Sequence, residues 1–226
     1  MINVPVIVIS SSVSGVGKST MALNLAAALW CDGYEVKIWA PNNKVIRNFC
    51  HQRTLLNRQN QITMPEPEII EEIDEKNYYP RTVILAVVPS ENIGLYENVF
   101  GLAHTLITVG TKEEDFNWSV DSEYVNLIWN AKKSIAARGV KYLNWIAVLN
   151  KQAENEDKKE LLEEYARRYG FRIAPPIHYR EAFRYVDNGY CTADMAKFGQ
   201  LFKMSMPDVY ARREILRLTD FLWQNK

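Results

Sequence analysis

The sequence predicts an α/β fold, in which a mostly parallel central sheet carries helices on both faces. Short β-rich runs alternate with longer helical stretches along the 226 residues, and this alternation is typical of parallel α/β proteins. Three candidate strands, at residues 81–88, 105–109 and 143–149, are apolar runs of the kind that strands covered on both faces require. A glycine-rich turn joins the first candidate strand of the chain to the first helix.

The expected elements are placed by their apolar pattern and by the turn residues between them. Asp32-Gly33 closes the first helix, Pro41-Asn42-Asn43 forms a turn, and Pro89 ends a strand. Strands are expected at residues 4–10, 35–40, 81–88, 105–109 and 143–149. Helices are expected at residues 18–31, 121–138, 156–169 and 207–223. The sequence contains no internal repeat and no Gly/Ser linker, so residues 1–226 are expected to form a single domain.

The composition argues against several classes of protein. The 27 lysines and arginines equal the 27 aspartates and glutamates, so no net charge directs the chain to nucleic acid or membranes. Cys31, Cys50 and Cys191 are widely spaced and form no CxxC pair, which disfavours a disulfide framework or a zinc site. No segment approaches the roughly 18 apolar residues that a membrane helix needs. A cytoplasmic protein without an integral membrane segment is expected.

The glycine-rich turn is the candidate phosphate site, and it consists of Ser14, Gly15, Val16, Gly17, Lys18, Ser19 and Thr20. Gly15 and Gly17 have no Cβ, so the backbone amides around them can approach phosphate oxygens closely. The ammonium of Lys18 would bind the β- and γ-phosphates. The hydroxyl of Ser19 would bind Mg²⁺, and that of Thr20 would lie nearer the α-phosphate. The following helix points its positive dipole end at the same anion.

The details of the turn point to one branch of P-loop proteins. The common P-loop has a glycine five residues before its Gly-Lys pair, where this chain has Ser12. The loop from Val13 to Thr20 resembles that of the deviant-Walker ATPases of the ParA/MinD superfamily, which reads Lys-Gly-Gly-x-Gly-Lys-Ser/Thr. Residues 144–151, 168–175 and 179–183 are similar to MipZ, the ParA-type regulator that positions the division plane in alphaproteobacteria. The resemblance is strongest in residues 1–40 and 120–200.

The resemblance implies a ligand and a set of partners. The ligand would be ATP or ADP, with Mg²⁺ if the metal site is intact. Asn150 occupies the position of an asparagine that hydrogen-bonds adenine in the family, and Pro175 lies where the next loop frames the base. The family's partners are ParB-like and FtsZ-like proteins and non-specific DNA, and ATP drives its homodimerisation. The arginines of the C-terminal third have acidic neighbours, which favours an ordinary solvated surface over a DNA contact.

Three residues that the family uses for hydrolysis are replaced in this chain. Val13 stands where the family has a second lysine, which reaches the partner's nucleotide in the dimer. Residues 38–43 replace the Asp-x-Asp pair that follows the second strand, and Val87 replaces the aspartate of the Walker B strand. Phosphoryl transfer depends on charge neutralisation and on a group that orients water. The resemblance therefore predicts nucleotide binding with weak or absent hydrolysis, and no catalytic residue is assigned.

Other interpretations remain open at this level. Glu91 or Asp115 could supply a displaced carboxylate, which would make the chain an active ParA-type ATPase. The same P-loop could also serve a small-molecule kinase or an ATP-dependent ligase. The amphipathic segment 207–223 could target a membrane, but its mixed charges favour a helix packed on the core.

Overall fold

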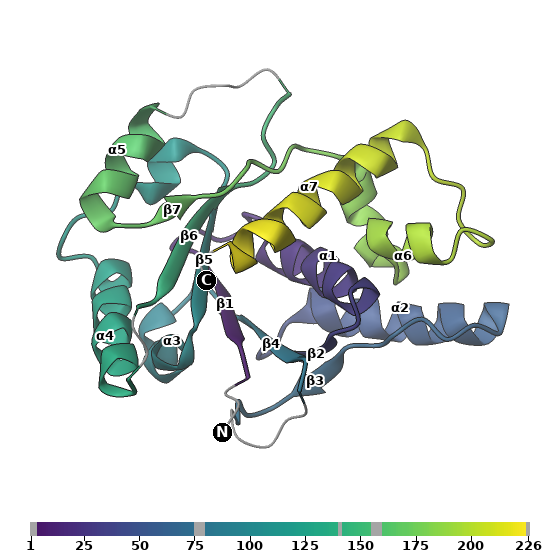
Figure 1. The fold of residues 1–226 in the computed structure, drawn as a ribbon, viewed down its shortest axis with the longest axis horizontal. Coiled ribbons are helices and arrows are strands. Elements are labelled where there is room, and N and C mark those ends of the chain that lie inside the picture. The colour runs from purple at the N-terminus through teal and green to yellow at the C-terminus, as the bar shows by residue number, and fades with distance from the viewer. Residues whose placement is uncertain (1–3, 75–79, 140–141, 155–159, 225–226) are drawn as a thin grey trace.

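The computed structural model describes residues 4–74, 80–139, 142–154 and 160–224. Its centre is a seven-stranded sheet with the strand order β3-β2-β4-β1-β5-β6-β7, and every neighbouring pair is parallel (Figure 1). The strands are β1 (Val6–Ser10), β2 (Glu35–Trp39), β3 (Glu68–Ile70), β4 (Thr82–Val87), β5 (Thr105–Gly110), β6 (Asn144–Leu149) and β7 (Arg172–Ile173). The predicted α/β class with a parallel sheet is therefore confirmed.

Helices cover both faces of the sheet. They are α1 (Lys18–Cys31), α2 (Lys44–Asn60), α3 (Glu97–Leu102), α4 (Glu123–Ala137), α5 (Glu160–Tyr169), α6 (Thr192–Lys197) and α7 (Met206–Trp223). Three 3₁₀ helices accompany them: η1 (Ile93–Tyr96), η2 (Glu113–Phe116) and η3 (Glu181–Asn188). Figure 1 shows α3, α4 and α5 on one side of the sheet and α1, α2, α6 and α7 on the other.

The core consists of two apolar layers, one on each face of the sheet. Side chains alternate between the faces along a strand, so Ile7 and Ile9 of β1 join the layer under α1 and α7. Val6 and Val8 of the same strand join the layer under α3 and α4. β1, β4, β5 and β6 are buried along their whole length, and this two-sided burial explains why most of their residues are apolar.

Most predicted elements agree with the structure to within one or two residues at each end. The predicted helix 156–169 is described from Glu160, and residues 156–159 lie outside the described part. The C-terminal helix α7 packs on the core as predicted, since Ala211, Ile215, Leu218 and Leu222 are buried in it. None of the described helices is long and apolar enough to cross a membrane.

Helix α2 is not predicted by the pattern of its sequence. Its buried residues are Ile46, Phe49 and Arg53, so only two apolar side chains mark the face that it turns to the core. Because an arginine occupies the position of a third apolar residue, the apolar face of this helix is too narrow for its sequence to predict an amphipathic helix. The short elements β3, β7 and α6 were also missed, because segments of two to six residues carry little periodicity.

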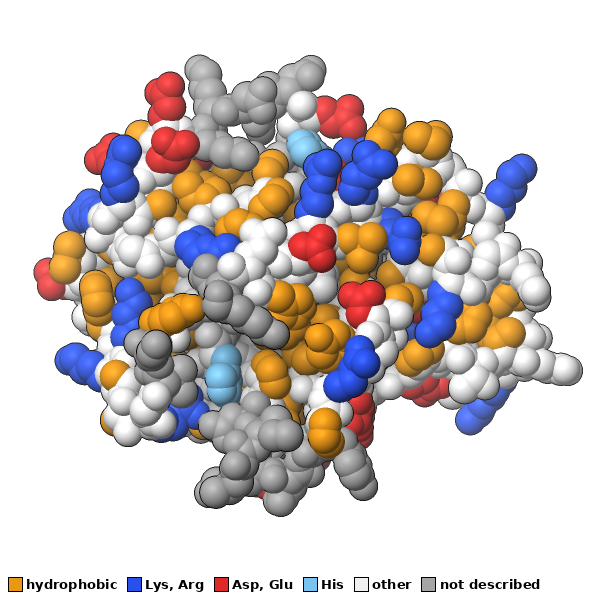
Figure 2. All heavy atoms as spheres, in the orientation of Figure 1, with side chains coloured by type: hydrophobic (Ala, Val, Ile, Leu, Met, Phe, Trp, Pro, Cys, Tyr) orange, Lys and Arg blue, Asp and Glu red, His pale blue; other side chains and the backbone are white. Residues whose placement is uncertain are grey.

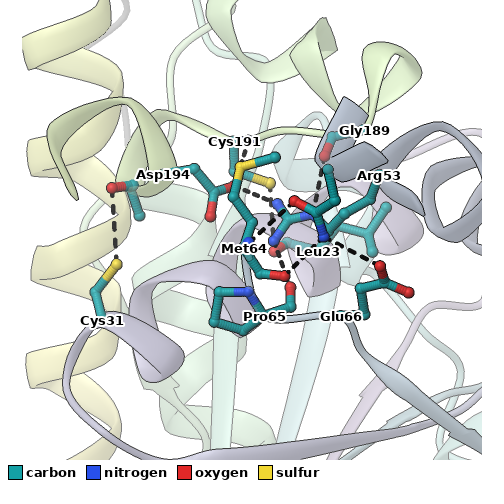
Figure 3. Close-up of polar contacts among 11 residues, drawn as sticks. Leu23, Cys31, Arg53, Met64, Pro65, Glu66, Gly189, Cys191 and Asp194 are labelled. Carbon is teal, nitrogen blue, oxygen red and sulfur yellow. Dashed lines mark hydrogen bonds and ion pairs between the residues drawn. The ribbon is translucent and has the colours of Figure 1, made fainter. Parts of the chain in front are cut away.

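Arg53 is completely buried and joins α2 to the segment that contains η3 and α6 (Figure 3). Its guanidinium forms an ion pair with Asp194 and donates hydrogen bonds to the carbonyl oxygens of Gly189 at 2.8 Å and Pro65 at 2.6 Å. The guanidinium carbon also lies 4.6 Å from the ring centroid of Phe49. The charge and most donors of Arg53 are thereby satisfied inside the core.

Backbone geometry allows this close approach. Gly189 has a left-handed φ of 81°, and a Cβ at this position would collide with the backbone nitrogen of Arg53. The backbone amide of Cys191 donates to Asp194 Oδ2 at 2.8 Å, so the acid also caps the start of α6. Burial raises the pKa of the Asp194 carboxyl, and the charge of Arg53 opposes that rise. The position of α2 therefore depends on a buried charge pair.

We predict that Arg53→Met destabilises the protein by about 3–5 kcal/mol, because it leaves the Asp194 carboxylate buried without its partner. Urea unfolding followed by circular dichroism measures the loss. The double variant Arg53→Met/Asp194→Asn serves as the control, since asparagine keeps an acceptor for the Cys191 amide and removes the charge. It should recover part of the loss. A single variant that unfolds at the wild-type midpoint would contradict the assignment.

Candidate phosphate-binding site

The glycine-rich turn lies at the carboxyl edge of the sheet, between the end of β1 and the start of α1. Gly15 and Gly17 have left-handed φ angles of 75° and 93°, which only glycine adopts readily. The α-helix that follows is 14 residues long and has no acidic side chain in its first turn. The N-terminal amides of this helix therefore present a positive end at the turn.

Buried hydroxyl groups hold the start of the turn. The Ser10 hydroxyl at the end of β1 lies 2.7 Å from the hydroxyl of Tyr124, which lies 2.7 Å from that of Thr108. Burial raises the pKa of Tyr124 to about 12, so this hydroxyl stays neutral. The indole nitrogen of Trp118 donates to Ser12 Oγ at 2.9 Å. These contacts fix the turn to α4 and to the loop before it.

A cavity of about 530 Å³ opens next to the turn. Its walls come from the turn, the end of β6, the segment 177–180, η3 and α7. Seven of the nine predicted site residues line it: Gly15, Val16, Gly17, Lys18, Ser19, Thr20 and Asn150. The other two, Ser14 and Pro175, are not among the residues that line the cavity, and their contacts with a nucleotide stay predictions.

Lys18 faces this cavity. Its ammonium donates a hydrogen bond of 2.5 Å to the hydroxyl of Ser90, which in turn donates to the carbonyl oxygen of Val13 at 2.9 Å. Burial lowers the pKa of Lys18. Within the described residues the ammonium contacts this hydroxyl and forms no ion pair with a carboxylate, so its charge is available to an anion in the cavity.

The hydroxyl of Ser19 contacts a residue of the turn after β2. Asn43 Nδ2 donates to Ser19 Oγ at 2.8 Å, and Asn43 Oδ1 accepts from the backbone amide of Ile46 at 3.2 Å. Asn43 is thereby the N-cap of α2. Asn43 and Ser90 were not predicted as site residues from the sequence. Asn43 closely follows β2 and Ser90 closely follows β4, and both strands lie on the same side of β1 in the sheet. This position at the strand ends is the signal that could have found them.

The end of β6 supplies two more contacts to the turn. Asn150 Nδ2 donates to the carbonyl oxygen of Val16 at 2.8 Å, and Lys151 Nζ donates to that of Gly15 at 2.8 Å. A Cβ on Gly17 would lie 2.5 Å from Asn150 Nδ2, so these two residues pack in direct contact. Asn150 thus contacts the turn, and the predicted contact with adenine stays a prediction.

Neither candidate acid, Glu91 or Asp115, is among the residues that line the cavity. Val87, which stands at the position of the Walker B aspartate, ends β4 and is buried in an apolar layer. Asp115 Oδ2 accepts hydrogen bonds from the backbone amides of Thr111 at 2.7 Å and Lys112 at 3.3 Å. The Asp115 carboxylate therefore caps η2, and these hydrogen bonds hold it at that position.

The charge of the cavity wall is positive. Lys18, Lys151, Arg180 and Arg184 line it, and Asp187 is the only acid among its described lining residues. The charge of Arg180 is balanced by Glu214, since its guanidinium donates to that carboxylate at 2.7 Å. Arg184 forms an exposed ion pair with Glu181 at 3.7 Å, so the excess positive charge comes from Lys18 and Lys151. This excess suits a polyanion such as a nucleotide phosphate.

The oxygen ligands that the described residues offer at the turn do not fit a magnesium ion held by the protein. Mg²⁺ prefers six oxygen ligands and is usually bound through one or two carboxylates together with phosphate. The predicted ligand Ser19 supplies one hydroxyl, which already accepts a hydrogen bond from Asn43. No group of three His, Cys, Asp or Glu residues that could hold a metal occurs in the described part of the chain.

Comparison with known proteins identifies the family and the fold of the chain. A family model described as ATPase MipZ matches residues 106–223, which are 118 of the 226 residues. No curated protein matches the chain. A solved structure of a putative plasmid partition protein from Borrelia burgdorferi B31, bound to AMPPNP, is similar with a TM-score of 0.59 and 16% identity. The similarity covers 98% of this chain and 99% of that chain.

Two further structures share the fold. A chain of the MinC:MinD cell division protein complex from Aquifex aeolicus is similar with a TM-score of 0.58 and 13% identity, over 98% of this chain and 96% of that one. Cobyrinic acid a,c-diamide synthase from Mycobacterium smegmatis, with a bound ATP analog and magnesium, reaches a TM-score of 0.53 at 14% identity. That match covers 90% of this chain and 100% of the synthase chain.

The parallel sheet, the glycine-rich turn and the helix after it define an α/β protein of the P-loop class. The chain belongs to the MipZ ATPase family, because the family model covers more than half of it. The matched part begins in β5, so the P-loop lies outside it and supports the assignment independently.

We predict that Gly17→Ala destabilises the protein more than Gly15→Ala does. Both substitutions place a side chain in the left-handed region, which costs about 1 kcal/mol. Only Gly17→Ala also crowds Asn150, and overpacking of this kind adds roughly 1–3 kcal/mol. A Cβ on Gly15 meets no atom within 4 Å, which makes it the matched control. Equal losses in urea unfolding would contradict the packing of Asn150 on the turn.

Proposed function

We propose that the chain is a cytoplasmic nucleotide-binding regulator of cell division or of chromosome or plasmid partition, with ATP hydrolysis weak or lost. Its ligand is ATP or ADP. The observation that carries the proposal is a P-loop whose Lys18 lines a cavity of cationic character. Among the described residues, the hydroxyl of Ser19 has Asn43 and not a carboxylate as its hydrogen-bond partner. Membership of the MipZ family supports the role in partition or division.

Three features of the site favour phosphate binding. The left-handed glycines open the turn for backbone amides, and α1 directs its N-terminus at the same point. Lys18 adds a half-buried charge without an acidic partner in the described residues. The contacts from Asn150 and Lys151 hold the turn in this shape, so little ordering is needed when a ligand binds.

The replaced acids favour slow hydrolysis. Transfer of the γ-phosphoryl group to water requires charge neutralisation and an oriented water molecule. Val87 and Asn43 offer neither a carboxylate for a metal nor a general base at the ends of β4 and β2. Loss of such groups removes on the order of several kcal/mol of transition-state stabilisation. The displaced carboxylates of the active-ATPase alternative are not supported, since Asp115 caps η2.

We propose a protein partner for this regulator, of the ParB-like or FtsZ-like kind. One similar structure is a complex of MinD with MinC, which are cell division proteins. Val13 has an aliphatic side chain and cannot supply a cation to a second nucleotide, so a lysine-bridged homodimer is not favoured. Lysines and arginines are interspersed with acids on the face in Figure 2, which gives little support to DNA binding through that face.

Nucleotide binding is tested first by thermal unfolding. At 100 times the dissociation constant a ligand adds about 2.7 kcal/mol, which raises the Tm of a chain of this size by roughly 5–10 °C. We expect this shift with ATP or ADP and its loss in Lys18→Ala. Lys133→Ala is the matched control, because Lys133 is an exposed lysine of α4 outside the cavity. The absence of a shift with millimolar ATP, ADP and GTP would refute nucleotide binding.

Hydrolysis is tested separately by release of inorganic phosphate in the steady state. We expect wild-type protein to release no more phosphate than Lys18→Ala, with and without added DNA. Faster release by the wild type would show that other groups replace the missing acids, and it would support the active-ATPase alternative. This result would leave the nucleotide-binding proposal intact.

A further inference from the structure

The side-chain amide of Asn43 has a defined orientation. Its oxygen accepts from the backbone amide of Ile46, so its NH₂ group faces Ser19 and donates to Oγ at 2.8 Å. Rotation of the amide by 180° would place its oxygen against the Ser19 hydroxyl and its NH₂ against the Ile46 N–H. Two donors would then face each other, so the observed orientation is favoured.

This contact decides what the Ser19 hydroxyl can do. A hydroxyl carries one hydrogen and two lone pairs, and here one lone pair accepts from Asn43. The hydroxyl hydrogen must therefore point to another acceptor. Ser19 lines the cavity, and the acceptors that a nucleotide brings there are phosphate oxygens. An aspartate in place of Asn43 would have the opposite effect, because a carboxylate would accept the hydroxyl hydrogen and leave the oxygen free for a cation.

We propose that Asn43 turns Ser19 from a metal ligand into a hydrogen-bond donor to the nucleotide phosphate, so that this chain binds nucleotide without Mg²⁺. The inference rests on the proposed nucleotide binding and concerns the way the same site neutralises phosphate charge. Lys18 and the N-terminus of α1 supply the positive charge in place of a metal ion held by the protein. Asn43 is a positioning residue, since it acts through Ser19.

Asn43 cannot easily move away from Ser19. It is the N-cap of α2, and loss of such a cap costs about 1 kcal/mol. Ten residues further along the same helix, Arg53 fastens α2 to Asp194 and to the carbonyl oxygens of Gly189 and Pro65. The helix therefore holds the amide against the P-loop.

Isothermal titration of the full chain with ATP tests the inference, in buffer with Mg²⁺ and in buffer with EDTA. We expect the dissociation constants of wild-type protein in the two buffers to agree within about threefold, because no protein group loses a metal contact. We expect Asn43→Asp to bind ATP at least about tenfold more weakly in EDTA than in Mg²⁺, because the new carboxylate repels metal-free phosphate. Aspartate is also a good N-cap, so α2 should remain folded and the Tm should change little.

Asn42→Asp is the matched control. Asn42 is exposed, has a left-handed φ of 53° that aspartate tolerates, and is not among the residues that line the cavity. It adds the same charge one residue away, and its binding should stay independent of Mg²⁺. Equal Mg²⁺ dependence in Asn42→Asp and Asn43→Asp would overturn the role of the Ser19 contact.

Three other results would overturn the inference. Wild-type protein that binds ATP only with Mg²⁺ would show that Ser19 still ligates a metal, and nucleotide binding itself would stand. Asn43→Asp that binds equally in both buffers would show that Asn43 does not control metal dependence. ATP that binds in neither buffer would refute the proposed function and this inference with it.

Discussion

The buried ion pair between Arg53 and Asp194 is the interaction on which the arrangement around the site depends. The pair joins α2, which follows β2, to α6. Arg53 and Asp194 are 141 residues apart in the sequence. Burial of the pair makes both charges costly unless they stay together, so the two segments hold one relative position. The N-terminus of α2 is thereby placed against α1, where Asn43 meets Ser19.

The candidate site at the carboxyl edge of the sheet has the backbone geometry of a phosphate-binding turn, and we propose that its metal and water chemistry is incomplete. Lys18, the two left-handed glycines and the start of α1 are arranged for an anion. The neighbouring strand ends carry an apolar residue and an amide where acids would serve hydrolysis. Binding and hydrolysis depend on different residues, so a chain can keep one and weaken the other.

The change from carboxylate to amide alters more than net charge. A carboxylate only accepts hydrogen bonds, whereas the amide of Asn43 accepts with one atom and donates with the other. Because its acceptor is used by the cap of α2, its donor meets the P-loop hydroxyl. The structural role of the residue as a helix cap thus fixes its chemical role in the site.

The sequence by itself determined the parallel α/β class, the long central strands and the phosphate turn. Each of these is a local pattern, since apolar runs, glycines and the helix after them act within a few residues. Only the tertiary structure decided which side chains meet at the turn. Ser90, Asn43 and Asn150 reach it from the ends of three strands, at sequence separations of 72, 24 and 134 residues from their partners. Those contacts follow from the order of strands in the sheet and from the buried Arg53, which local periodicity does not encode.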